Sequence, residues 1–463
     1  NHPIGLRERH DMATKHGFPY AELEFDAKGK FGANQLKAAL ETLRAPGLTD
    51  VLVLSHGWNN DIADARKWYG EYLKHLRAEV DARRVPGIER RALGVVAIFW
   101  PSKKFADSEL VPGNANAIGA SVTRSGVRKQ LALLASAFPD KASKAKFAAA
   151  DKLLDRIESD VAAQRKFVDL LRGFWPTGKA GADALPAAGA GKSGDQVLQL
   201  LAPPILDLPT AKPGGAGRGG ATSIGGAGRG VGGTGGAGGA SRGEAANLFG
   251  SVLDGVRNAL NMTTYFTMKE RAGIVGANGL AVVVQRIRGE FPALKLHLAG
   301  HSFGGRVVTA CVNALPKGAA SRVDSLFLMQ AAFSHYGMAQ KYDGTSNGLF
   351  RSVISDRKVA GPIYITYTAK DKAVGLAYPL ASRLGGQVAA GLGDENDKYG
   401  GIGRNGAQKT PEVTPHELLP VTQQYAFNAG GVYNLDANAV ITGHSDICRP
   451  EVAHALASAI AST

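Results

Sequence analysis

A serine stands between two glycines at residues 300–304, where the sequence reads Gly-His-Ser-Phe-Gly with the serine at position 302. An apolar run, LKLHLA, precedes it and a helix-compatible run, GRVVTACVNAL, follows it, so Ser302 falls where a strand turns into a helix. Gly300 and Gly304 let the strand and the helix pass closely without Cβ clashes. Such a turn strains the serine backbone and places its hydroxyl at a helix N-terminus, which favours developing negative charge. The pattern predicts a nucleophile rather than a Gly-Ser turn without a chemical role.

A serine hydroxyl is a weak nucleophile, so it needs a histidine base that is held by a carboxylate. With this type of serine turn the expected chain order is serine, acid, histidine. Asp371 directly follows the strand-like run PIYITYTAK and is the acid that we predict. Aspartate is also a favoured N-cap of helices, and this structural role for Asp371 stays open.

The base is expected after the acid in the chain. His444 lies after the last expected strand and before the last expected helix, with small residues around it. His416, in a proline-rich loop, is the alternative base. His335 precedes the acid, and His454 falls inside the last helix, where packing or solvation is the expected role. His444 is therefore the predicted base.

Acyl transfer also needs two backbone N–H donors aimed at the oxyanion that forms. We expect one from Phe303, the residue after the nucleophile. The other is expected from the loop after an early strand, DVLVLSHGWNND, where Gly57 permits a close backbone approach and the N–H of Trp58 is the predicted donor. An ordinary turn at the end of the strand is the alternative interpretation of His-Gly-Trp.

Strand-like and helix-like runs alternate on both sides of these residues. The alternation extends over residues 1–100 and resumes over residues 273–463. It predicts the α/β class, with a mostly parallel central sheet flanked by helices. The two stretches are expected to form the two halves of one core, and the second half carries the predicted serine, acid and histidine.

Residues 101–272 interrupt this alternation. Residues 125–175 are rich in alanine, lysine and leucine and are compatible with helix, as are residues 245–272. Between them, residues 177–243 are dominated by glycine, alanine, proline and serine, a composition that buries too little apolar surface to offset the entropy of ordering. We expect a helical, cap-like insertion that contains a flexible Gly-rich segment. Whether the insertion is a mobile lid stays open.

At the serine turn and the His-Gly-Trp loop the sequence resembles the α/β-hydrolase superfamily, specifically its lipase- and esterase-like members with a Gly-His-Ser-x-Gly-Gly turn. The resemblance covers roughly residues 20–100 and 273–463. The run IFWPSKKF also resembles a group of bacterial predicted serine hydrolases with a Trp-Pro-Ser turn. The family more commonly carries a lid after its sixth strand, so the insertion at 101–272 departs from its pattern.

The resemblance implies an α/β-hydrolase fold and a serine hydrolase that cleaves carboxylic esters through a Ser-His-Asp acyl-enzyme. Lipase or carboxylesterase is the expected activity, and phospholipase is one option within it. No cofactor and no metal are expected. The expected partner is a small-molecule or lipid ester. Two alternatives stay open: another acyl-transfer enzyme (amidase, peptidase or acyltransferase), and a non-catalytic binding protein on the same fold that contacts a polyanion.

Composition sets wider bounds. Over 463 residues the net charge is +14, which favours contact with polyanions such as an anionic membrane surface. Nucleic acid is not the expected partner, because the few Arg-Gly sites have no aromatic residues between them. Two cysteines exclude a disulfide scaffold. Neither a run of 18 apolar residues nor a signal-like N-terminus is visible, which leaves cytoplasmic and exported locations open. The oligomeric state is not indicated.

Overall fold

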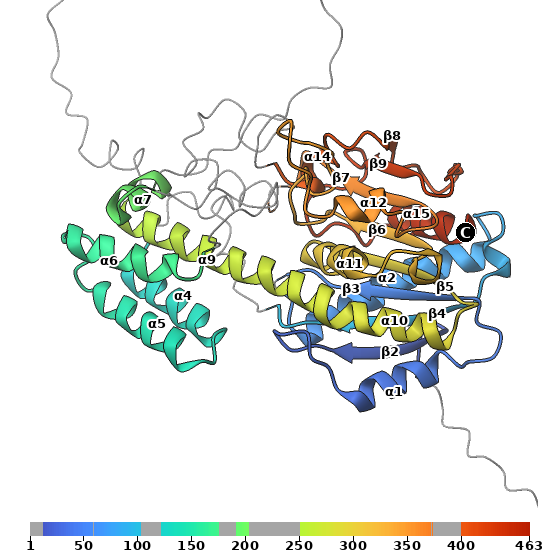
Figure 1. Cartoon of the computed structure of the whole chain (residues 1–463), viewed down its shortest axis with the longest axis horizontal. Helices are drawn as coiled ribbons and strands as arrows, with labels where there is room; N and C mark the ends of the chain where they lie inside the picture. The colour runs from blue at the N-terminus through green and yellow to red at the C-terminus, as the bar shows by residue number, and fades with distance from the viewer. Residues whose placement is uncertain are drawn as a thin grey trace, which may run out of the picture.

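A computed structural model describes residues 13–58, 60–102, 122–175, 191–202, 251–371, 373 and 400–463 (Figure 1). These residues form a nine-stranded sheet in the order β1-β2-β4-β3-β5-β6-β7-β9-β8. Every neighbouring pair of its strands is parallel except the short β1–β2 pair. The prediction of a mostly parallel α/β sheet is confirmed. The strands are β1 (Thr14–Lys15), β2 (Phe18–Glu24), β3 (Asp50–Ser55), β4 (Leu93–Phe99), β5 (Lys295–His301), β6 (Ser325–Met329), β7 (Ile363–Tyr367), β8 (Val413–Glu417) and β9 (Val432–Asp436).

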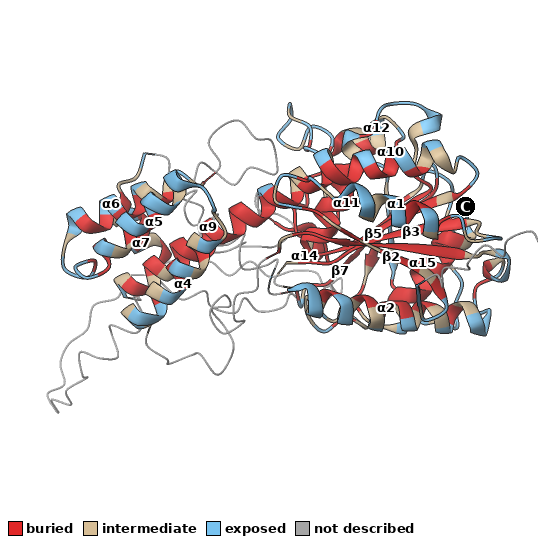
Figure 2. Ribbon diagram, turned by 90° about the horizontal axis from the view of Figure 1, so that it is seen from below, coloured by how far each residue is buried: buried red, intermediate tan, exposed pale blue. Residues whose placement is uncertain are grey.

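Helices cover both faces of the sheet (Figure 2). Strand β3 shows how the sequence separates these faces, because successive side chains of a strand point to opposite sides. Val51 and Val53 pack in the core beneath α1, α10 and α11, whereas Leu52 and Leu54 pack against α2 and α15. The helices of this part are α1 (Ala33–Thr42), α2 (Ile62–Ala82), α10 (Ala281–Glu290), α11 (Phe303–Ala314), α12 (Arg351–Ser355), α14 (Ile402–Asn405) and α15 (Pro450–Ala461).

Strands β3 and β5 lie side by side at the centre of the sheet, with Ser55 opposite Gly300. After β3 the chain continues through α2 to β4 on one side, and after β5 it continues through α11 to β6 on the other side. The order of the strands therefore reverses between β3 and β5. Ligands of open α/β sheets bind beyond the carboxyl ends of the strands at such a point. The His-Gly-Trp loop and the serine turn both begin there.

A separate group of helices lies to one side of the sheet (Figure 1). Residues 125–175, expected as helix, form three helices, because Asp140 and Asp160 each cap a new helix by accepting backbone N–H bonds. Trp175 ties this group to the long helix α9 by donating its indole N–H to Thr263 over 2.8 Å. The helices here are α4 (Arg124–Ser136), α5 (Lys141–Leu153), α6 (Val161–Arg172), α7 (Gly194–Leu201) and α9 (Val252–Ile274).

Helix α7 corrects part of the expected Gly-rich segment. Val197, Leu198 and Leu201 are buried, at the spacing of three and four that places them on one helix face, and α7 packs against α6 and α9. Gly194 and Gly255 permit these contacts, because a Cβ on either would clash with backbone atoms of the neighbouring helix. Residues 177–190 and 203–243 of that segment lie outside the described residues.

Helix α9 does not end at the boundary expected between residues 272 and 273. It continues through a π-helical turn, Val275–Leu280, directly into α10. The turn passes very close to the core: a Cβ on Gly276 would lie 2.2 Å from the carbonyl oxygen of Val307, and one on Gly279 would lie 2.5 Å from that of Gly29. One continuous helix therefore belongs both to the helical group and to the sheet.

The C-terminal part of the sheet contains a strand that the sequence analysis assigned to a proline-rich loop. Strand β8 pairs in parallel with β9 and forms an edge of the sheet. Proline is tolerated at an edge because only one side of the strand is paired, and most of this strand is exposed. Among the helices that the structure describes, none is both long enough and apolar enough to cross a membrane.

Candidate active site

Ser302 occupies a strained turn between β5 and α11. Its backbone has φ 56° and ψ −125°, an unfavourable conformation for a residue with a side chain. A Cβ on Gly300 would lie 2.3 Å from the carbonyl oxygen of Gly304, and a Cβ on Gly304 would lie 2.3 Å from that of Ser55. Only glycine fits at both positions. The strain is therefore held by close packing of β5 and α11 against the end of β3.

His444 and Asp371 converge on this serine. The Ser302 hydroxyl donates to His444 Nε2 over 2.8 Å, and His444 Nδ1–H donates to Asp371 Oδ2 over 2.8 Å. Asp371 follows β7 and is fully buried, whereas the side chain of His444 is 18% exposed. The carboxylate is shielded from water while the imidazole keeps a route to solvent. The three residues stand in the order and geometry of a nucleophile, a base and an orienting acid.

The other histidines considered for the base lie elsewhere. His416 is on the edge strand β8, with Nδ1 2.9 Å from the carbonyl oxygen of Glu417 and its ring against Tyr425. His335 is buried beside Asn405. His454 is buried in α15 and bonds Glu79 and the carbonyl oxygen of Gln423, which agrees with the packing role expected for it.

The loop after β3 lies against the serine. A Cβ on Gly57 would come within 2.8 Å of Ser302 Cβ, so this backbone approaches the nucleophile as closely as a glycine allows. The carbonyl of Gly57 accepts from His56 Nδ1–H over 2.8 Å and from the Asn60 amide over 3.2 Å. Because a trans peptide is planar, these bonds also fix the plane that contains the Trp58 N–H.

Phe303 is the first residue of α11, so its N–H belongs to the first turn and has no acceptor within the helix. It is the donor position expected directly after the nucleophile. The Phe303 ring contacts Trp58, with centroids 5.9 Å apart, and Tyr265 of α9, 5.2 Å away. An aromatic wall thus lies beside the serine, and the helix from the predicted insertion supplies one of its three rings. Tyr265 was not predicted from the sequence, since no motif marks it.

Two buried histidines brace the site. His56 stacks on Trp100, accepts from the Trp100 N–H through Nε2 over 3.3 Å, and receives the Trp100 indole N–H on its carbonyl oxygen over 2.9 Å. His301 donates Nε2–H to the carbonyl oxygen of His444 over 2.9 Å. Burial lowers the pKa of His56 to about 4, and burial together with the nearby His444 lowers the pKa of His301 to about 3. Both rings are therefore neutral at ordinary pH.

The turn that carries His444 is also tied from its far side. Asp446 accepts from the backbone N–H and the hydroxyl of Thr442 over 3.0 Å and 2.7 Å. Arg449 donates two bonds of 2.7 Å to the same carboxylate. Asp446 thus orients the loop that carries His444 and also caps the backbone of its own turn.

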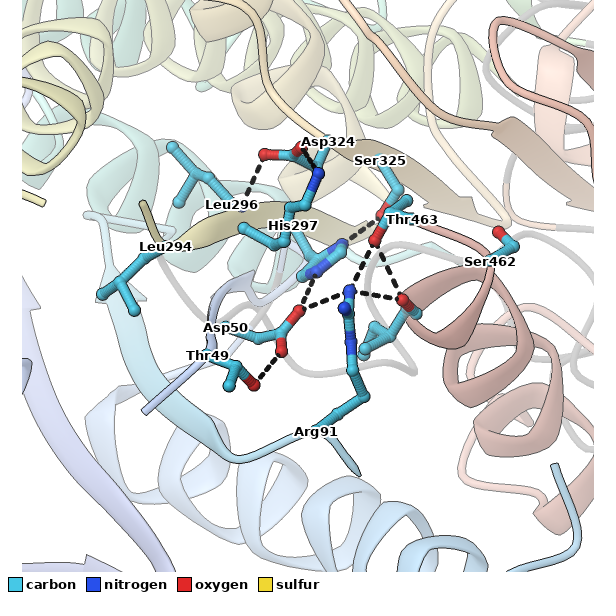
Figure 3. A network of polar contacts seen from close by, with 12 residues as sticks. Thr49, Asp50, Arg91, Leu294, Leu296, His297, Asp324, Ser325, Ser462 and Thr463 are labelled. Atoms are coloured by element: carbon cyan, nitrogen blue, oxygen red, sulfur yellow. Dashed lines mark hydrogen bonds and ion pairs between the residues drawn. The ribbon is translucent and has the colours of Figure 1, made fainter. Parts of the chain in front are cut away.

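A second hydrogen-bonded Ser–His–Asp set, drawn in Figure 3, lies near the amino ends of the strands, opposite the end that carries Ser302. The Ser325 hydroxyl donates to His297 Nδ1 over 2.8 Å, and His297 Nε2–H donates to Asp50 Oδ1 over 2.8 Å. Arg91 pairs with the same carboxylate over 2.9 Å and donates to Thr463 near the end of α15. Ser325, His297 and Asp50 are completely buried. These residues were not predicted from the sequence, because they are far apart in the chain and match no motif.

The Ser302 site thus combines a serine in a strained turn, a histidine and an aspartate bonded to it in series, and backbone N–H groups close by. This arrangement suits attack on an acyl carbon. Within the described ranges, no group of three His, Cys, Asp or Glu side chains has the arrangement of a metal site. Comparison of the chain with protein-family models, with curated proteins and with solved structures found no match.

Proposed function

We propose that this chain is a serine hydrolase of the α/β-hydrolase fold that cleaves carboxylic esters. The observation that carries the proposal is the hydrogen-bonded set Ser302–His444–Asp371, with two 2.8 Å hydrogen bonds, at a strained turn beyond the carboxyl end of β5. The order nucleophile, acid, base along the sequence and the position at the reversal of strand order both support this assignment.

In the proposed reaction Ser302 Oγ attacks the ester carbonyl carbon while its proton passes to His444 Nε2. Asp371 holds the imidazole in the tautomer that can accept this proton and stabilises the imidazolium. The N–H groups of Phe303 and Trp58 stabilise the tetrahedral oxyanion. When the intermediate collapses, the imidazolium protonates the departing alkoxide and the alcohol leaves.

A water molecule then attacks the acyl-enzyme and gives one proton to His444. The second tetrahedral intermediate collapses, the proton returns to Ser302, and the carboxylic acid leaves. Every proton in both half-reactions moves through one imidazole nitrogen, Nε2, because Nδ1–H stays bonded to Asp371. No cofactor is needed for these steps.

The aromatic wall supports esters that have an apolar group next to the reacting carbonyl. Phe303 and Tyr265 are almost completely buried and back this wall, whereas Trp58 is partly exposed and is the ring with surface left for a substrate. Apolar surface of this kind gains free energy in proportion to the substrate area that it buries. Lipase, phospholipase and short-chain esterase activities all use such a surface and differ in the length of chain bound.

The deciding experiment is hydrolysis of p-nitrophenyl esters, from acetate to palmitate, by the wild type, Ser302→Ala and Ser325→Ala. We expect kcat of Ser302→Ala to fall by roughly six orders of magnitude. Ser325→Ala is the matched control, because it removes a serine that also bonds a histidine but lies at the opposite end of the strands. Its kcat should stay near that of the wild type.

Equal activity in the wild type and Ser302→Ala would reject the proposal. Activity toward p-nitroanilides that exceeds activity toward the matched esters would replace esterase by amidase. Binding of anionic vesicles by a chain that hydrolyses neither substrate would favour the non-catalytic alternative.

A further inference from the structure

We infer that His301 is a positioning residue, which holds the base His444 in place through the backbone of the turn that carries it. This inference rests on the proposed function, since it assigns a role toward the proposed nucleophile and base. The observation is the 2.9 Å hydrogen bond from His301 Nε2–H to the carbonyl oxygen of His444. The two residues are 143 positions apart in the chain.

The direction of the His301 side chain follows from its place on β5. Ala299 packs in the core cluster shared by α2 and α15, and His301, two residues later, points to the same face. The turn that carries His444 comes directly before α15. Strand β5 therefore ends in a side chain that points toward the loop of His444, and the proposed nucleophile Ser302 is the next residue.

The ring of His301 is wedged among the parts of the site. It stacks on Trp68 of α2, with centroids 5.9 Å apart and planes inclined by 24°, and its centroid is 4.9 Å from that of His444. On the side of the β3 loop, a Cβ on Gly57 would lie 2.9 Å from His301 Nδ1. Contacts from three directions leave this ring one orientation, in which Nε2–H points at the His444 carbonyl.

A neutral ring suits this place. With Nε2 as donor, Nδ1 carries no proton, and the low pKa of His301 keeps this form throughout the ordinary pH range. During the proposed reaction His444 becomes an imidazolium with its ring 4.9 Å away. A neutral neighbour does not oppose that charge, whereas a second cation would.

The bond from His301 fixes the position of the turn that carries His444. The turn that carries His444 is held from outside by Asp446 and from inside by His301. Without the inner bond, a partly buried carbonyl loses its donor and the turn can shift away from β5. A displacement of the base by about 1 Å costs roughly 100-fold in rate, because proton transfer needs hydrogen-bond distance to the serine.

The test compares His301→Leu with His301→Gln, because the amide nitrogen of glutamine can take the place of Nε2–H. His454→Leu and His454→Gln are the matched controls: His454 is also a buried histidine whose Nε2–H donates to a backbone carbonyl, that of Gln423, over 2.7 Å. We expect His301→Leu to lower kcat roughly 100-fold with little change in KM. His301→Gln should recover most of the lost kcat, and both His454 variants should lower only the melting temperature.

A second readout needs no substrate. The proton between His444 Nδ1 and Asp371 should give a low-field NMR signal in the wild type that His301→Gln keeps and His301→Leu broadens or loses. If the wild type hydrolyses no ester, the proposed function fails, and this signal still decides the role of His301. An unchanged signal in His301→Leu would overturn the inference. So would a folded His301→Gln with no more activity than His301→Leu, or a loss of kcat of equal size in His454→Leu.

Discussion

Two hydrogen-bonded Ser–His–Asp sets lie at opposite ends of the strands of one sheet, and strand β5 contributes to both. At its carboxyl end Ser302 bonds His444, and near its amino end His297 bonds Ser325 and Asp50. The hydrogen bonds have equal lengths of 2.8 Å. The surroundings differ: Ser302 stands in a strained turn at the start of a helix, whereas Ser325 begins a regular, buried strand.

The difference shows that hydrogen-bond connectivity does not by itself make a reactive serine. Attack needs access, a helix N-terminus or other N–H groups for the oxyanion, and an imidazole that can exchange protons. In the Ser302 set, 18% of the His444 side chain is exposed, but His297 is fully enclosed. The enclosed set joins β3, β5, β6 and, through Arg91, the end of α15. Its consequence is cohesion of the fold.

The largest difference between the two Ser–His–Asp sets is expected when the aspartate of each is replaced. In Asp371→Asn the amide cannot hold His444 in the tautomer that accepts the serine proton, so kcat should fall by about 10⁴-fold with little loss of stability. In Asp50→Asn, Arg91 loses its buried counter-charge, and the free energy of unfolding should fall by roughly 3 kcal/mol while kcat of the folded enzyme stays near that of the wild type. Ester hydrolysis and urea unfolding of both variants measure the two effects. Similar kcat values in the two variants would contradict the difference in role between the two Ser–His–Asp sets.

Gly57→Ala tests the close contact between the β3 loop and Ser302. The new Cβ would lie 2.8 Å from Ser302 Cβ, so either the loop or the serine must move. We expect kcat to fall roughly 100-fold, because the oxyanion donors are displaced. Gly289→Ala is the control, since a Cβ there meets nothing within 4 Å and α10 gains a better helix former. Both variants should have melting temperatures equal to or above that of the wild type, and steady-state kinetics of both would test the effect on kcat. An unaffected kcat in Gly57→Ala would contradict it.

The smallest effect is on stability in acid. His56 and His301 have folded-state pKa values of about 4 and about 3, below the ordinary value of 6.5. Below 6.5 the unfolded chain binds protons that the folded chain excludes, so the stability that these neutral rings contribute is complete above 6.5 and is lost as the pH falls toward their folded values.

Each of these histidines adds at most about 1.4 kcal/mol per pH unit to that slope. Urea midpoints measured from about pH 7.5 to about pH 4.5 should decrease, and less steeply in His301→Gln than in the wild type. The same slope in both proteins would show that His301 takes up its proton equally in the folded and unfolded states.

The serine turn and its place in the sheet follow from local sequence. Gly300 and Gly304 are dictated by contacts of backbone with backbone, and such contacts leave a pattern that reads directly from the residues. The α/β class follows from the alternating apolar runs, and the order along the chain led to Asp371 and His444 as the partners of Ser302.

Contacts made by tertiary packing could not be predicted in this way. Strand β8 has little apolar periodicity, because it is an exposed edge that pairs on one side only. Helix α7 is short, and its helical state depends on burial against α6 and α9. His301 and His444 meet across 143 residues, and His297 and Asp50 across 247. Nothing local marks such pairs.

The continuous helix from α9 through the π-helical turn to α10 limits how this chain can be divided. Residues from its first turns complete the core of the helical group, Tyr265 contacts Phe303 beside the nucleophile, and its last turns cover the sheet. The helical group is therefore not a detachable module with a seam at its border. If the helical group is exchanged for another segment, by recombination or by design, the joint must lie N-terminal to Tyr265, inside a helix and in register. Otherwise the exchange also replaces part of the aromatic wall beside Ser302.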